Sequence, residues 1–229
     1  MIKKIILFIF NVIIGLLLMS IITTVIYKFI NPPFTPVMII RVFEGMFEGK
    51  FIGIDKSWRS YDEISKNIFR AVISAEDARF MSHNGIDWKA IDQAKRYNEI
   101  HKGKKKRGAS TITMQTAKNA FLWHGRNYIR KGLEAYFTVL IEAIWGKKRI
   151  LEVYVNIVEL GEGVYGVEAA ANKYFNKSAK NLTKREAALL ASVLPNPRIW
   201  SPDKPTKYLE SRVSFIQGRM NSVAIPKDK

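Results

Sequence analysis

Residues 62–88 read DEISKNIFRAVISAEDARFMSHNGIDW, and the first half of this stretch has the spacing of an amphipathic helix. Its apolar residues recur at steps of three and four, at Ile64, Ile68, Val72 and Ala75. Residues spaced in this way form one stripe along a helix. Asp62 or Ser60 is a suitable N-cap. The stripe leads into Glu76 and Asp77, so we expect a core helix that ends in two carboxylates.

The same spacing predicts further helices at 88–100, 111–122, 128–145, 148–158, 164–174 and 184–193. The last of these begins with the capping box Thr183-x-x-Glu186. Glycine or proline interrupts the helical period at 102–108, 160–163 and 195–197, where we expect loops. No run alternates with period two between hairpin turns, so the sequence predicts a mainly α domain.

The N-terminal segment 5–30 carries no acidic residue and no cation before Lys28, which predicts a transmembrane helix. A cleaved signal peptide is the alternative, but the apolar run is too long and no small-x-small site follows it. Lys3 and Lys4 favour a cytoplasmic N-terminus. We expect three parts: a cytoplasmic tip and anchor at 1–30, a linker and membrane-proximal segment at 31–57, and a domain at 58–229. Within the second part, the glycine-punctuated stretch 37–58 predicts an irregular or extended segment.

Composition narrows the class of partner. The 229 residues carry a formal net charge of +17, which favours a polyanion such as nucleic acid, an anionic bilayer or a phosphorylated substrate. The membrane anchor favours the last two. The absence of cysteine is compatible with an oxidising exterior.

The pair Glu76-Asp77 stands beside apolar packing, where the charged form of a carboxylate is disfavoured and its proton affinity rises. Such a group suits general acid or base catalysis. Taken alone, a Glu-Asp pair is more often a solvated helix end.

A second segment, 102–119, reads KGKKKRGASTITMQTAKN and sets five cations before a possible helix start. Backbone N–H groups at such a start suit an anion, although a run of cations is usually a solvated loop. Thr111, Gln115 and Lys118 are spaced by four and three residues, which puts them on one helix face.

A third segment places Arg130 and Glu134 one helical turn apart, which by itself is only a stabilising ion pair. Metal catalysis has little support, because His83, His101 and His124 are the three histidines and no His-x-x-x-His pair occurs.

The order Glu-Asp, Gly-x-Ser-Thr and Arg-Lys-x-x-Glu resembles the monofunctional biosynthetic peptidoglycan transglycosylases, the family 51 glycosyltransferases. The resemblance covers roughly 58–202 and includes GASTITMQTAKNAFLW, RKGLEAYFTVLIE, KRILEVYVN, GVYGVEAAANKYF and EAALLASVLPNP. Met114 departs from the pattern, since the family commonly has glutamine before the residue that matches Gln115.

The resemblance implies a lysozyme-like helical domain with a small membrane-proximal jaw, held by one anchor in the bacterial cytoplasmic (inner) membrane and facing outward. It implies polymerisation of lipid II onto a nascent glycan strand, with inversion to a β-1,4 linkage and release of undecaprenyl pyrophosphate. No cofactor is required, although a divalent cation could stimulate the reaction. Membrane lipid is a further partner, other cell-wall synthases are candidates, and nucleic acid is not expected.

The family's roles fall on the matching residues of this chain. Glu76 is the general base and Glu134 positions cations or assists departure of the leaving group. The remaining residues implied in substrate binding are Asp77, Phe80, His83, Ser110, Thr111, Gln115, Lys118, Asn119, Arg130 and Lys131. We expect Lys118, Arg130 and Lys131 to meet the pyrophosphate, and the basic loop from Lys102 to Arg107 to attract it.

Two other functions remain open from the sequence. A lytic transglycosylase or lysozyme-like hydrolase also uses one glutamate in a helical fold, but it has no pyrophosphate leaving group for the cations to serve. A membrane-tethered basic protein would bind anions with a steep salt dependence and no turnover.

Overall fold

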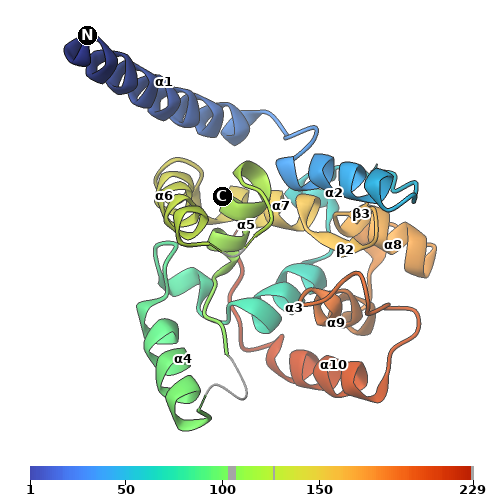
Figure 1. The fold of residues 1–229 in the computed structure, drawn as a ribbon. Coiled ribbons are helices and arrows are strands. Elements are labelled where there is room, and N and C mark those ends of the chain that lie inside the picture. Colours follow the sequence, from blue (N-terminus) through green and yellow to red (C-terminus); the bar gives the residue numbers. More distant parts are fainter. Residues whose placement is uncertain (103–106, 126, 228–229) are drawn as a thin grey trace.

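The structure is a computed structural model that describes residues 1–102, 107–125 and 127–227; most of the predicted basic loop lies outside these residues. The chain is mainly helical, as predicted (Figure 1). The elements in chain order are α1 (Ile2–Phe29), α2 (Pro36–Phe47), β1 (Asp55–Lys56), α3 (Lys66–Glu76), α4 (Trp88–Ile100), α5 (Ile112–Phe121), α6 (Tyr128–Ile144), α7 (Gly146–Ile157), β2 (Glu159–Gly161), β3 (Val164–Tyr165), α8 (Val167–Phe175), α9 (Lys184–Val193) and α10 (Lys207–Arg219).

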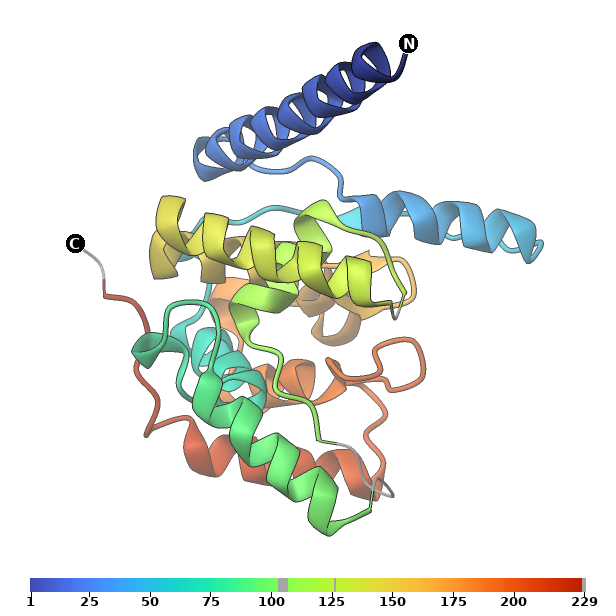
Figure 2. The ribbon, with the colours of Figure 1, turned by 60° about the vertical axis from the view of Figure 1, so that its left-hand side comes forward.

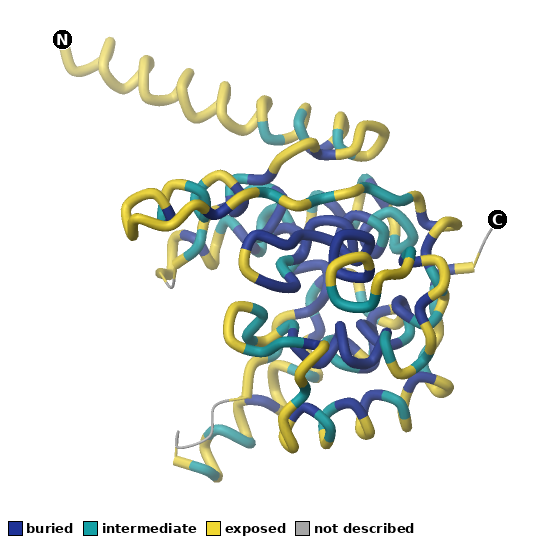
Figure 3. Tube along the Cα trace, turned by 90° about the vertical axis from the view of Figure 1, so that its right-hand side faces the viewer, coloured by how far each residue is buried: buried dark blue, intermediate teal, exposed yellow. Residues whose placement is uncertain are grey.

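Helix α1 covers the predicted span and is long and apolar enough to cross a membrane. Residues 1–19 are all exposed, as the yellow N-terminal helix of Figure 3 shows. The C-terminal part of α1 contacts the rest of the protein through side chains and through its backbone. Trp145 Nε1 donates a hydrogen bond to the carbonyl of Thr24 over 2.7 Å, and Arg149 Nη2 donates one to the carbonyl of Tyr27 over 2.8 Å.

Helix α2 shows that the irregular or extended segment expected at 37–58 is wrong in its first part, whereas residues 50–58 are irregular or extended as predicted. The Thr35 side chain caps the helix by accepting from the Met38 N–H. Gly45, which suggested a break, is a packing residue: a Cβ at this position would lie 2.6 Å from Ile52 Cγ1. The glycine therefore lets the returning chain fold closely against α2.

The core lies between two groups of helices that meet around α3 and α5. Helix α3 packs against α9 and α10, while α5 packs against α6 and α7. The dark segments of Figure 3 concentrate in this central region. Helix α3 begins later than expected: Ser65 is its N-cap, and Ser60 instead opens a short 3₁₀ turn through a capping box with Glu63. Asp62 belongs to that turn.

A small sheet joins the membrane-proximal region to the core. Strand β3 pairs in parallel with β1 and antiparallel with β2. The loop predicted at 160–163 is therefore wrong in part, since a strand reaches Gly161 and the turn is confined to Glu162 and Gly163. Gly163 has φ +71°, and a Cβ there would lie 2.6 Å from the Gly53 carbonyl oxygen. Strands this short are below the length at which period-two alternation can be recognised.

The other predicted helices are confirmed within a few residues, and α4 and α9 have the predicted bounds. Helix α10 was not predicted. Figures 1 and 2 place α1, α2 and α6 on one side of the molecule, and α4 and α10 at the opposite end. A membrane crossed by α1 would thus lie nearest α2 and α6.

Candidate active site

Glu76 is the last residue of α3, held at the core by the buried apolar stripe of that helix. At Asp77 the backbone leaves helical geometry, with φ −157° and ψ 71°. Glu76 Oε2 accepts a hydrogen bond from Gln115 Nε2 over 2.8 Å. The fold thus joins two residues that the sequence singled out in separate segments.

A buried tyrosine orients the glutamine. The Tyr154 hydroxyl, on α7, donates to Gln115 Oε1 over 3.0 Å. Tyr154 has no exposed surface, and burial holds its pKa well above the usual value, so the hydroxyl stays protonated. Because the amide oxygen is engaged by Tyr154, the amide NH₂ faces Glu76.

The environment of Glu76 tunes its proton affinity. Burial raises the pKa of Glu76, while the hydrogen bond from Gln115 and the positive charges of Arg212 and Lys118 oppose that rise. A carboxylate with a raised pKa accepts a proton more readily than a solvated one. Glu76 is therefore suited to act as a general base near neutral pH.

Asp77 and His83 connect the end of α3 to the start of α5. Both oxygens of Asp77 lie 3.0 Å from His83 Nε2, and Oδ2 also accepts from the Ile112 N–H over 3.1 Å. Thr111 caps α5 by accepting from the Met114 N–H. These contacts hold the helix that carries Gln115 and Lys118 against the end of α3.

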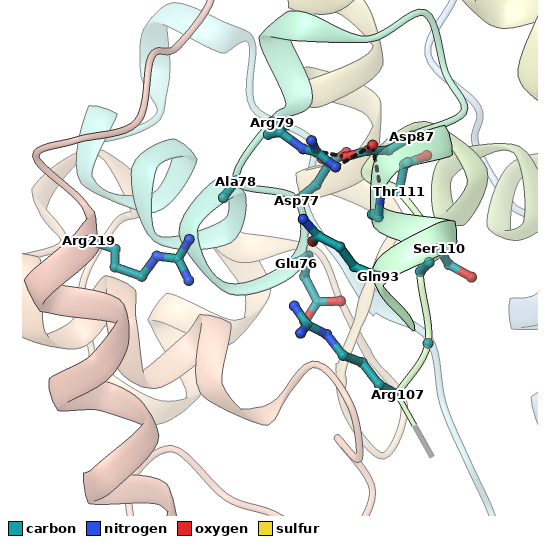
Figure 4. Close-up of a pocket in the computed structure, with 13 residues that line it drawn as sticks. Glu76, Asp77, Ala78, Arg79, Asp87, Gln93, Arg107, Ser110, Thr111 and Arg219 are labelled. Atoms are coloured by element: carbon teal, nitrogen blue, oxygen red, sulfur yellow. Dashed lines mark hydrogen bonds and ion pairs between the residues drawn. The ribbon is translucent and has the colours of Figure 1, made fainter. Parts of the chain in front are cut away.

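Glu76 lines a cavity of about 310 Å³, termed here the carboxylate cavity (Figure 4). Other residues in its wall include Asp77, Arg79, Asp87, Gln93, Arg107, Ser110, Thr111 and Arg219. Arg79 forms a bidentate ion pair with Asp87, with N···O distances of 2.9 and 2.6 Å. The cavity thus lies between the end of α3, the start of α4, the segment before α5 and the end of α10.

A second cavity of about 540 Å³, termed the cation cavity, begins on the other side of Gln115. Its polar wall consists of Arg41, Gln115, Lys118, Asn119, His124, Arg130 and Glu159. Since Gln115 lines this cavity and donates to Glu76 in the carboxylate cavity, the two cavities adjoin at that hydrogen bond.

The predicted cations gather around one buried carboxylate. Arg130 Nη1 lies 2.6 Å and Lys131 Nζ 2.5 Å from the two oxygens of Glu134, which is 3% exposed. Burial lowers the pKa of Lys118, and Glu134 opposes that effect. Arg130 and Lys131 pair directly with Glu134, and the charge of Lys118 adds to theirs, which leaves excess positive charge to attract an anion.

The remaining predicted residues differ in their access to the two cavities. Asn119 is in the wall of the cation cavity, and Ser110 is exposed at the carboxylate cavity. Among the described residues, neither cavity has Phe80, His83, Lys131 or Glu134 in its wall. Phe80 is fully buried, with Lys147 Nζ 4.5 Å from its ring centroid.

One cluster in the described part of the chain has the geometry of a metal site. Ligand atoms of Asp77, His83 and Asp87 lie within 4.8 Å of one another. However, Asp87 is paired with Arg79, and Asp77 accepts from His83 and a backbone N–H. A cation at this position would have to displace these partners, so the residues fit a metal poorly.

Sequence reasoning missed several residues at the site, and three of them are Tyr154, Arg41 and His124. Tyr154 occupies an apolar position of α7 and there resembles an ordinary core residue. Arg41 lies in the segment expected to be irregular, and His124 was considered only as a metal ligand. All three depend on tertiary contacts, and no local motif marks them.

Comparisons with known proteins show which family the sequence matches. A sequence model of the family described as Transglycosylase matches residues 48–221. A Bdellovibrio bacteriovorus protein named biosynthetic peptidoglycan transglycosylase is 54% identical over 201 residues, covering 88% of this chain and 79% of the relative. Relatives with the same name are 47% identical in Pseudomonas fluorescens strain SBW25, covering 93% of this chain and 88% of the relative, and 45% identical in Shewanella oneidensis, covering 97% and 94%.

Proposed function

The chain belongs to the biosynthetic peptidoglycan transglycosylase family and is a glycosyltransferase of peptidoglycan synthesis; from this premise we propose that it polymerises lipid II. The 4-hydroxyl of one lipid II attacks the anomeric carbon of a growing glycan strand. The bond to undecaprenyl pyrophosphate breaks, the configuration inverts, and a β-1,4 linkage forms. The products serve cell-wall biogenesis and cell shape.

In this proposal Glu76 is the base that takes the proton from the attacking hydroxyl. The observation that carries the assignment is its position: the carboxylate is held at the junction of two cavities by Gln115, and burial raises its pKa. We propose that the attacking sugar approaches Glu76 from the carboxylate cavity. The anomeric carbon of the donor then lies toward Gln115 and the cation cavity.

The leaving pyrophosphate gains negative charge as the glycosidic bond breaks, so fixed cations lower the barrier most at that end. Lys118 and Arg130 line the cation cavity, and Lys131 adds a third charge beside Glu134. In the described structure Glu134 pairs with Arg130 and Lys131 and lines neither cavity. This supports a role in positioning the two cations. Asn119 and Gln115 supply amides for sugar or phosphate oxygens.

The membrane arrangement supports a lipid-linked substrate. Val37 and Arg41 of α2 line the cation cavity, so this cavity opens beside the first helix after the anchor. The exposed Phe43, Met46 and Phe47 of α2 provide apolar surface for the bilayer interface. We propose that α1 spans the bacterial cytoplasmic membrane, with the N-terminus inside and the enzyme outside.

The two alternative functions differ in what they predict. A hydrolase would release sugars from preformed glycan and would not need the cluster around Glu134. A non-catalytic anion-binding protein would have no use for a carboxylate of raised pKa at the edge of its cation site.

We propose that no cofactor is required, that a divalent ion could stimulate the reaction, and that other cell-wall synthases are candidate partners.

The test compares the full-length wild-type protein in detergent with Glu76→Gln and with Glu99→Gln, which changes an exposed glutamate of α4. Each is incubated with labelled lipid II, and products are separated by size. We expect long glycan from the wild type and from Glu99→Gln, and none from Glu76→Gln. If Glu76→Gln also makes polymer, Glu76 is not the general base, and Glu134 becomes the next candidate. Release of sugars from preformed glycan, without polymer, would identify a hydrolase.

A further inference from the structure

Unpartnered nitrogen atoms concentrate in the wall of the cation cavity. Among the described residues, six buried side-chain polar atoms have no hydrogen-bond partner. Three of the six belong to residues that line this cavity: Arg41 Nε, His124 Nε2 and Arg130 Nε. A buried polar atom without a partner is costly, so three around one cavity point to a ligand that supplies the missing partners.

The ligand is an anion, because the groups facing it are mainly cationic or proton-donating. The proposed function already gives Lys118 and Arg130 the role of binding the donor's pyrophosphate. It does not account for Arg41 and His124, which come from α2 and from the segment between α5 and α6. We propose that Arg41 and His124 are two further ligands of the donor diphosphate, an assignment that rests on the proposed function.

Arg41 has two carboxylate partners, and one of them is held loosely enough for a ligand to replace it. Its Nη1 lies 2.6 Å from Glu44 Oε2, while its Nε faces Glu159 Oε2 at 3.6 Å, too far for a hydrogen bond. Burial raises the pKa of Glu159, and the positive charges of Arg41 and Arg198 oppose that rise only in part, so the negative charge of Glu159 is incompletely stabilised at this position. A diphosphate oxygen could therefore replace Glu159 as the partner of Nε and form a charge-assisted hydrogen bond.

His124 supplies a charge only when the anion is present. Burial lowers the pKa of His124 to about 4, with Arg41, Lys118 and Arg198 acting in the same direction and Glu44 against them. The imidazole is therefore neutral in the free enzyme at pH 7. A diphosphate among these cations reverses the sign of the local field, raises the pKa of His124 and favours proton uptake. Binding is then coupled to protonation of His124.

Through Arg41, a bound diphosphate would link helix α2 to the catalytic core. Arg41 lies on the helix that directly follows the membrane anchor, whereas Lys118 and Arg130 lie on α5 and α6. A diphosphate that contacts all three would hold α2 against the catalytic core. The membrane-proximal helix would then help to retain the lipid-linked donor between successive additions.

The test measures binding of farnesyl diphosphate, a short prenyl diphosphate, to the full-length protein in detergent by calorimetry. Arg41→Gln should weaken binding about tenfold, the loss expected for one charge-assisted hydrogen bond. The matched control is Arg96→Gln, which removes a cation that is ion-paired within α4. Glu159→Gln should tighten binding severalfold, because it removes a carboxylate that competes with the ligand for Arg41.

For His124 the decisive measurement is the pH dependence. The loss of affinity in His124→Leu should be small at pH 8 and should grow as the pH falls toward 6, because only the protonated imidazole adds charge. Protonation of the ligand itself is common to the wild type and the variant, so it cancels in the comparison. His101→Leu, at the end of α4, is the control and should follow the wild type.

Each outcome decides between the assignments. If the wild type polymerises lipid II and binds farnesyl diphosphate, but Arg41→Gln and His124→Leu bind like their controls, this inference is wrong and the proposed function stands. If Glu159→Gln weakens binding as Arg41→Gln does, the loss reflects damaged structure and the assignment of Arg41 is wrong. If the wild type neither polymerises lipid II nor binds the diphosphate, the proposed function itself fails.

Discussion

Replacing Tyr154 with phenylalanine removes one hydroxyl from the core and leaves the ring in place. That hydroxyl donates to Gln115 Oε1, and Gln115 Nε2 donates in turn to Glu76 Oε2. Without Tyr154 the amide loses the contact that fixes its orientation, and its oxygen can turn toward Glu76. The ionised form of Glu76 is then less well stabilised, so its pKa rises further.

A neutral hydrogen bond contributes about 1 kcal/mol net, which corresponds to a factor of about five at 25 °C. The general base works when deprotonated, so its activity is present above its pKa and is lost as the pH falls. In Tyr154→Phe we expect the acid limb of the kcat/KM profile to move to higher pH. The rate should fall about fivefold on that limb and change little at alkaline pH, as measured by polymerisation of labelled lipid II.

Tyr165→Phe is the matched control, because Tyr165 is also fully buried but its hydroxyl has no hydrogen-bond partner among the described residues. Its pH–rate profile should match that of the wild type. An equal loss of activity at every pH in Tyr154→Phe would show that the hydroxyl supports the fold without tuning Glu76. An unchanged profile would show that Gln115 keeps its orientation without Tyr154.

Three further predictions concern charge, backbone conformation and the anchor. Lys118→Met should reduce polymerisation at least about a hundredfold without lowering the free energy of unfolding in urea; a clear loss of stability would contradict this. Gly166→Ala should destabilise the protein by about 1–3 kcal/mol, because Gly166 has φ +80° and a Cβ would lie 2.6 Å from the Asn156 carbonyl oxygen. Urea unfolding measures the loss, and a free energy of unfolding equal to that of the wild type would contradict the prediction. Arg149→Gln should loosen α1 by removing the bonds to the Tyr27 carbonyl. The chain has no cysteine of its own, so spin labels can be attached to cysteines introduced in α1 and α6. The distribution of distances between the labels should be broader in Arg149→Gln, and an unchanged distribution would contradict the role of Arg149.

The fold was predictable where local signals agree. The apolar run of α1 and the capping box of α9 each specify a helix without tertiary information. Helix α2 was missed because Gly45 resembles a breaker until its contact with Ile52 is known. The strands were missed because two or three residues are too few to show a period. In both cases the deciding contact joins residues that no local pattern connects.

The site was predictable where a motif specifies the chemistry. It was less predictable where burial decides how strongly a pair of charged residues interacts. Arg130 and Glu134 could be a solvent-exposed ion pair worth a few tenths of a kcal/mol. In the structure Arg130 is 8% and Glu134 3% exposed, so the pair lies in a medium that screens charge poorly. Spacing alone cannot distinguish these two environments.

Lys118 shows why this positive charge is better explained by function than by stability. Burial lowers its pKa, which means that the folded state disfavours the charge that Lys118 carries at neutral pH. Arg130 and Lys131 lower the pKa further, and Glu134 compensates only in part. The unfolded chain has no such penalty, so Lys118 opposes folding in full below its folded-state pKa, and this opposition disappears as the pH rises from that value to the higher pKa of the unfolded chain. Methionine fills similar space without the charge, so Lys118→Met should gain stability as it loses the donor site. An anion bound beside Lys118 removes the same penalty, and a diphosphate should therefore raise the melting temperature of the wild type more than that of Lys118→Met, which keeps the other cationic groups of the cavity.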